Sequence, residues 1–182
     1  MTSLDRTPLE GLLDKQAITE VLYRYARACD RADETLMRGC FHPGSIHRHG
    51  RYQGTSTEFV TLAMTIIRTA TRTKHLVTNP LIEFEGGAAL SECHYLAYHR
   101  IPNAETGAEE DNFSGGRYLD RFERRGGVWK IAERVGLLDF ERFDSAAERN
   151  FAGLLPAQRS RRYPEDELYT RFLPGNRPWG VA

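Results

Sequence analysis

The sequence predicts an α+β fold in which N-terminal helices pack against a cone-shaped, curved antiparallel sheet and enclose a pocket. Three observations predict it. Apolar residues recur at helical spacing near the N-terminus, and four long strand-like segments follow. A pair of glycines lies at two of the junctions between these strands. Helices followed by a meander of strands are typical of one helical layer on one sheet, and 182 residues suffice for such a domain.

The first element is an amphipathic helix over residues 12–29. Its apolar positions recur every three or four residues, and they are Ile18, Val21, Leu22, Tyr25 and Cys29. A shorter helix is predicted over residues 34–40. It should end before Pro43 and Gly44, which are typical of a break in regular structure.

Two short strands are predicted over residues 45–49 and 51–53. Thr55 followed by Glu58 has the pattern of a capping box and predicts the start of a third helix. The apolar stripe expected on that helix consists of Phe59, Leu62, Ala63, Ile66 and Ile67.

Four longer strands complete the predicted sheet. Alternating patterns place them at 75–85, 90–101, 112–125 and 128–140. The pairs Gly86-Gly87 and Gly126-Gly127 predict tight hairpins, because glycine tolerates the positive φ angles of short turns.

We interpret residues 1–140 as the folded domain and residues 141–182 as a C-terminal extension. The extension holds seven arginines, six acidic residues and four prolines, with little periodicity. Its aromatic residues are expected to anchor it on its own or a neighbouring subunit, and they are Tyr163, Tyr169, Phe172 and Trp179. A partly disordered tail is the alternative.

Composition restricts the class of partner. The chain has 25 basic and 25 acidic residues, so no overall field attracts nucleic acid or an anionic membrane. Three widely spaced cysteines without a CxxC pair predict buried thiols. Because there is neither a signal peptide nor an apolar stretch of about 18 residues, we expect a soluble, cytoplasmic protein.

Asp30 and His75 are the most informative candidate residues. Asp30 lies near the end of the first predicted helix, and His75 begins the first long strand. An imidazole held by a carboxylate has a fixed tautomer and suits proton abstraction from a carbon next to a carbonyl. Without further information, a surface carboxylate paired with Arg27 or Arg31 and a hydrogen-bonded core histidine remain open alternatives.

Several segments of the chain resemble the SnoaL-like family of the nuclear-transport-factor-2-like superfamily, in its scytalone dehydratase and dehydrochlorinase branch. The resemblance covers about residues 8–140. Its motifs are the opening helix from Lys15 to Asp30, the Thr73-Lys74-His75 sequence, and residues 118–131, YLDRFERRGGVWKI.

The resemblance implies catalytic roles for Asp30, His75 and Tyr25. It also implies substrate-binding roles for Arg134, His94 and Tyr118. Alternatives are core packing for Tyr25 and a strand-face ion pair of Arg134 with Glu133 or Asp120. At 100° per residue Tyr25 and Asp30 lie about 140° apart, so they converge only if the helix ends near residue 29. On the 90–101 strand His94 and His99 lie on opposite faces, and only one can face a pocket.

The leading interpretation is therefore an enzyme, a cofactor-independent, dehydratase-like lyase that uses an Asp-His base on a hydrophobic cyclic small molecule. The alternatives are an isomerase or cyclase with the same base, and a non-catalytic ligand-binding or assembly module. No metal is expected, because His47-x-His49 lacks a third ligand. Open sheet faces and the aromatic tail predict a homo-oligomer, and the resemblance implies a trimer or a dimer.

Overall fold

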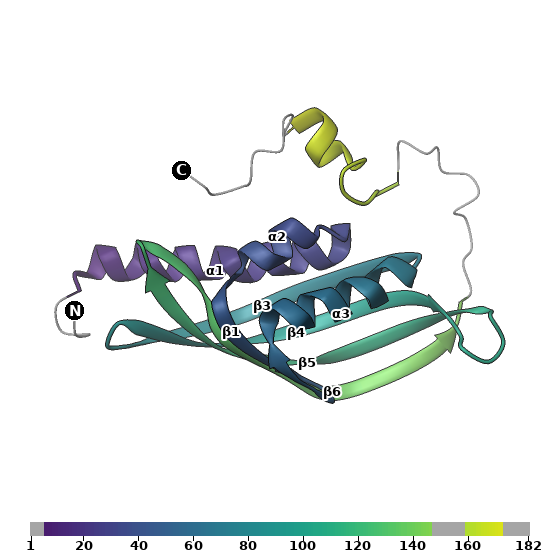
Figure 1. Cartoon of the computed structure of the whole chain (residues 1–182), viewed down its shortest axis with the longest axis horizontal. Coiled ribbons are helices and arrows are strands. Elements are labelled where there is room, and N and C mark those ends of the chain that lie inside the picture. The colour runs from purple at the N-terminus through teal and green to yellow at the C-terminus, as the bar shows by residue number, and fades with distance from the viewer. Residues whose placement is uncertain (1–5, 147–158, 173–182) are drawn as a thin grey trace.

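Three helices lie on one side of a curved, six-stranded sheet in the computed structural model, which describes residues 6–146 and 159–172 (Figure 1). The helices are α1 (Pro8–Arg31), α2 (Glu34–Gly39) and α3 (Ser56–Thr69). The strands are β1 (Phe41–His49), β2 (Tyr52–Thr55), β3 (Arg72–Glu85), β4 (Ala88–Pro102), β5 (Glu109–Arg125) and β6 (Val128–Ser145). The predicted α+β class is confirmed.

Capping boxes start both long helices. The Thr55 hydroxyl accepts from the Glu58 amide at 3.2 Å, and the Glu58 carboxylate accepts from the Thr55 amide at 3.3 Å, which confirms the predicted start of α3. Thr7 and Glu10 form the same arrangement before α1. The C-cap of α1 is Ala32 at φ 49°, so this helix continues through Asp30.

The strand order of the sheet is β2-β1-β6-β5-β4-β3. Strands β3 to β6 form the predicted antiparallel meander, with positive φ angles at Gly86, Gly126 and Gly127 in the hairpins. Strand β1 pairs with β6 in parallel. The sheet is therefore mixed and remains open, with β2 and β3 at its edges.

The predicted break at Pro43 and Gly44 is wrong, because β1 begins at Phe41 and runs through both residues. The pairing of β1 with β6 shifts register between Phe41 and Ile46. Such an irregularity tolerates a proline without a donor N–H and a glycine, Gly44, at φ 76°. Tertiary pairing thus overrides the local signal.

The stripe predicted for α3 is partly wrong. Phe59 and Ile67 are buried as expected, but Leu62 and Ile66 are 45% and 55% exposed. The buried face is completed by other residues of the helix, namely Ser56, Val60 and Met64. Because α3 is apolar around much of its circumference, packing against β1 decided which face turned inward.

An ion pair lies in the core between the helices and the sheet. Arg134 of β6 donates from Nε and Nη2 to the two carboxylate oxygens of Asp120 on β5, each at 2.7 Å, and both side chains are 0% exposed. The guanidinium contacts the rings of Tyr25 and Tyr118, with its carbon 4.3 and 4.2 Å from their centroids. One cluster therefore joins α1, β5 and β6.

Residues 159–172 lie against the C-terminal end of α1. The Tyr163 amide donates to the Arg31 carbonyl at 2.8 Å, and the Tyr163 and Tyr169 rings form a T-shaped contact at 5.0 Å. Phe172, in the single π-helical turn η3 (Leu168–Phe172), is 66% exposed, and Trp179 lies outside the described residues. No helix in the described ranges is long and apolar enough to cross a membrane.

Replacing Arg134 by methionine should destabilise the fold by about 3–5 kcal/mol, because it leaves the Asp120 carboxylate buried without a partner. Chemical denaturation measures the change. Arg142→Met is the matched control, since Arg142 pairs with Asp144 on the exposed end of β6 and should cost about 1 kcal/mol or less. Equal losses in the two variants would contradict a structural role for the buried pair.

Candidate active site

The two residues with the strongest sequence signal meet where α1 lies over β3. His75 Nδ1 is 2.9 Å from Asp30 Oδ1, and each side chain is 9% exposed. The Thr73 hydroxyl, two residues before His75, donates to the Asp30 carbonyl at 3.3 Å and so ties β3 to the end of α1. The distance between His75 Nδ1 and Asp30 Oδ1 is that of a hydrogen bond.

This contact fixes the tautomer of the His75 ring. A carboxylate only accepts hydrogen bonds, so Nδ1 carries the proton and donates it to Asp30. In the neutral form of the ring, the Nε2 atom then keeps its lone pair. A histidine held in this way has one nitrogen oriented by the protein and one able to accept a proton from a ligand.

The second histidine beside His75 is His99, which the sequence did not single out. The two rings form a T-shaped contact with centroids 4.9 Å apart. Burial lowers the pKa of His99 to about 4, against the effect of a hydrogen bond with the Asn112 side chain. His99 is therefore neutral near pH 7.

Strand alternation separates His99 from His94. His94 is exposed on the outer face of β4, whereas its neighbours Cys93 and Tyr95 are buried on the inner face with Ala97. The structure thus does not bring His94 to the Asp30–His75 pair. The buried, apolar character of positions 93, 95 and 97 was the signal that could have selected His99.

Tyr25, Tyr118 and Arg134 come together, but in the core cluster rather than at the Asp30–His75 pair. Tyr25 is 3% exposed, Tyr118 is 4% exposed and Arg134 is fully buried. Because α1 continues to Arg31, it lacks the early end that would have turned Tyr25 toward Asp30. Burial raises the pKa of both tyrosines well above its usual range, so they stay protonated. Arg134 forms an ion pair with Asp120, which is one of the alternatives that the sequence left open for this arginine.

His47 and His49 of β1 extend the histidine-rich interior. The His47 ring stacks on Phe59 with centroids 3.5 Å apart and is 5.9 Å from the His49 ring. Burial, followed by the Arg134 charge, lowers the pKa of His47 to about 2 and that of His49 to about 4. Both nitrogens of His47 are buried without a hydrogen-bond partner in the part of the chain that the structure describes. Among the described residues no group of three or more His, Cys, Asp or Glu could hold a metal.

A groove of about 340 Å³ runs along the seam between α1 and β3, at the Asp30–His75 pair. Its lining combines aromatic and aliphatic surface with basic side chains, and the residues are Tyr23, Ala26, Arg27, Asp30, Arg31, Lys74, His75, Leu76 and Val77. The volume lies in the range of small-molecule sites.

Comparison with known proteins agrees with this fold and with the expected resemblance. The model of the SnoaL-like domain matches residues 10–135. The chain belongs to the SnoaL-like domain family. No curated protein matches its sequence.

Solved structures of SnoaL-like fold include two dehydrochlorinases. A hexachlorocyclohexane dehydrochlorinase, LinA type 2, is 18% identical, with a TM-score of 0.71 over 81% of this chain and 100% of its own. The type 3 enzyme from Novosphingobium barchaimii LL02 is 17% identical, with a TM-score of 0.69 over 79% and 98%. A provisionally named scytalone dehydratase from Novosphingobium aromaticivorans DSM 12444 is 20% identical, with a TM-score of 0.64 over 80% and 97%. The TM-scores show a shared fold despite the low sequence identities.

His47→Phe should make this SnoaL-like protein less sensitive to acid. The folded His47 stays neutral down to about pH 2, while the unfolded one takes up a proton below about pH 6.5, so stability falls as the pH decreases through this range. Wild type should lose about 2 kcal/mol between pH 7 and pH 5 through this histidine alone. Urea denaturation at both pH values measures the difference, and parallel losses in the two proteins would contradict it.

Proposed function

We propose that the protein is a lyase that uses Asp30 and His75 as a base on a cyclic, hydrophobic small molecule, without a cofactor. The observation that carries the proposal is the 2.9 Å contact between His75 Nδ1 and Asp30 Oδ1, which leaves Nε2 as the proton acceptor. The groove along α1 and β3 gives a small molecule a route to these two side chains.

The proposed elimination begins with proton transfer from a substrate carbon to His75 Nε2. The electron pair of the broken C–H bond forms a carbon–carbon double bond, and the leaving group departs from the adjacent carbon with its bonding electrons. If the leaving group is hydroxide, the imidazolium returns the proton and water is released. The Asp30 carboxylate stabilises the imidazolium between these steps and holds its orientation.

His99 is proposed to bind the polar group of the substrate. The Asn112 amide nitrogen donates to Glu141 at 2.9 Å, which leaves the amide oxygen to accept from the His99 ring. The other nitrogen of a neutral His99 can then accept a hydrogen bond from a substrate hydroxyl. In this proposal His99 provides an acceptor for a substrate hydroxyl beside the base His75. Elimination chemistry is also supported by the names of the similar proteins, a dehydrochlorinase and a scytalone dehydratase.

An isomerase or cyclase would begin with the same proton abstraction and remains the second candidate. A ligand-binding module without catalysis is less well supported, because it requires no oriented imidazole beside a carboxylate. The buried Arg134–Asp120 pair and the two tyrosines are proposed to support the site from the core rather than to contact substrate.

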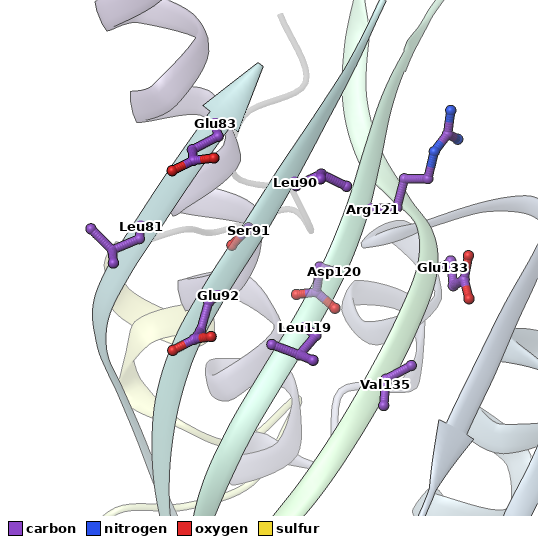
Figure 2. Close-up of a pocket in the computed structure, with 10 residues that line it drawn as sticks. All are labelled: Leu81, Glu83, Leu90, Ser91, Glu92, Leu119, Asp120, Arg121, Glu133 and Val135. Carbon is purple, nitrogen blue, oxygen red and sulfur yellow. The ribbon is translucent and has the colours of Figure 1, made fainter. Parts of the chain in front are cut away.

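The outer face of the sheet is proposed to bind another copy of the chain. It exposes large apolar side chains that a single chain leaves uncovered, among them Leu76, Leu90, Leu96 and Phe140. A pocket of about 500 Å³ opens on the same sheet (Figure 2), and its lining residues come from four strands, β3 to β6. We therefore propose a homo-oligomer, a trimer or a dimer, assembled through this face.

His75→Ala should lower kcat/KM by about 10²–10⁴-fold while the melting temperature stays close to that of wild type, because the base is lost and the fold is retained. Steady-state assays with cyclic hydroxy-ketones and chlorinated rings measure release of water or chloride. Asp30→Asn should act in the same direction. His94→Ala, on the outer face, is the control and should keep wild-type activity. A His75→Ala variant with the wild-type rate would exclude the proposed base.

Leu96→Glu combined with Phe140→Glu should convert the oligomer into monomers, because two buried, unpaired carboxylates would oppose the contact. Light scattering coupled to gel filtration measures the mass. The control is Leu62→Glu, a similarly exposed leucine on the helical side. A wild-type protein that is already monomeric would rule out this interface.

A further inference from the structure

The segment 159–172 holds an arginine beside the Asp30–His75 pair. Its position follows from contacts at the end of α1. The Tyr163 amide donates to the Arg31 carbonyl, and Asp166 pairs with Arg31 Nε at 3.4 Å and accepts from the Arg161 amide at 3.0 Å. Arg31 directly follows Asp30, so this segment lies next to the proposed base.

Arg162 is anchored at one nitrogen only. Its Nη2 donates to the carbonyl of Ala70, two residues before β3, at 2.6 Å. Its Nη1 is buried without a hydrogen-bond partner, and within residues 6–146 and 159–172 the guanidinium makes no ion pair. The anchored nitrogen thus fixes the side chain, while the other remains able to donate.

Electrostatics agree with this placement of Arg162. Burial lowers the pKa of its guanidinium, and the Asp30 carboxylate opposes that change. Arg162 in turn contributes to the lowered pKa of His99, after burial and His75. The charge of the Arg162 guanidinium therefore interacts with both Asp30 and His99, the two side chains that contact the His75 ring.

Two neighbouring arginines already have a carboxylate that balances their charge. Arg134 has both oxygens of Asp120, and Arg31 has Asp166. Arg134 Nη1 and Arg31 Nε are also buried without a hydrogen-bond partner among the described residues, so what distinguishes Arg162 is its lack of a paired carboxylate. A buried N–H without an acceptor is costly, because it loses water and gains nothing in return. An oxygen atom of a bound ligand would remove that cost at Arg162 and would be paired with a positive charge.

We propose that Arg162 binds the carbonyl oxygen of the substrate and stabilises the negative charge that develops there when His75 takes the proton. This inference rests on the proposed function and specifies it. In this step the C–H bond breaks, the proton moves to His75 Nε2, and the electron pair is delocalised onto the carbonyl oxygen as an enolate, which then expels the leaving group. The substrate class is a carbonyl compound, such as a cyclic β-hydroxy ketone, rather than a halogenated hydrocarbon without oxygen.

The test uses 4-nitrophenol, whose phenolate imitates an enolate and whose visible absorption reports binding, with nitrobenzene as the neutral analogue. Titrations of the full-length protein give both dissociation constants at one pH. Arg162→Gln should weaken binding of the phenolate by about 10- to 100-fold, because a charge-assisted hydrogen bond is lost. Affinity for nitrobenzene should not change.

Arg161→Gln is the matched control, because this exposed neighbour belongs to the same segment. It should bind the phenolate as wild type does. Arg162→Lys keeps the charge and should give an affinity between those of Arg162→Gln and wild type, with an unchanged melting temperature. Equal phenolate affinity in Arg162→Gln and wild type would overturn the proposal, as would a wild type that does not prefer the phenolate.

His75→Gln separates this proposal from the proposed base. It keeps Arg162, so the effect of Arg162→Gln on phenolate binding should persist in the His75→Gln background. Wild-type turnover in His75→Ala together with this effect would overturn the base and leave the anion site standing. Lost turnover in His75→Ala without any effect of Arg162→Gln would overturn the anion site alone.

Discussion

The bidentate pair of Arg134 and Asp120 is the interaction on which the arrangement of helix and sheet depends. Both side chains are completely buried, so their desolvation is compensated only if β5 and β6 keep the register that holds the two 2.7 Å hydrogen bonds. The rings of Tyr25 and Tyr118 both contact the guanidinium, and the Tyr25 contact extends that constraint to α1. The position of α1 on the sheet in turn sets where Asp30 meets β3.

The interior of this protein differs from an ordinary apolar core because it contains several histidines, which are polar but uncharged. Burial keeps His47, His49 and His99 neutral near pH 7, and Arg134 is neutralised by Asp120. Asp30 and Arg162 are ionic groups close to His75. Asp30 has the exposed Lys74 ammonium 4.0 Å away, and Arg162 makes no ion pair within residues 6–146 and 159–172. A site of this kind can exchange a proton with a neutral substrate and balance the charge that follows.

The two faces of the sheet carry different kinds of side chain. The inner face carries the histidines, tyrosines and the ion pair and is covered by helices, while the outer face leaves leucines and phenylalanines exposed. Residues 159–172 meet the fold at the end of α1, on the helical side. In the proposed function, chemistry and assembly lie on opposite sides of the sheet, so that a change on one face need not disturb the other.

The sequence by itself determined the α+β class, the cap of α3 and the hairpin glycines, because caps, periodicity and turn residues are local signals. The pairing of Asp30 with His75 was expected from the resemblance to the SnoaL-like family, since no local signal joins residues so far apart in the chain. The sequence did not determine the path of β1 through Pro43, the inward face of α3, or the choice of His99 over His94 at the site. It also did not determine the burial of Arg134 or the place of Arg162. Each of these depends on contacts between residues far apart in the chain, and the energy of such contacts exceeds local preference.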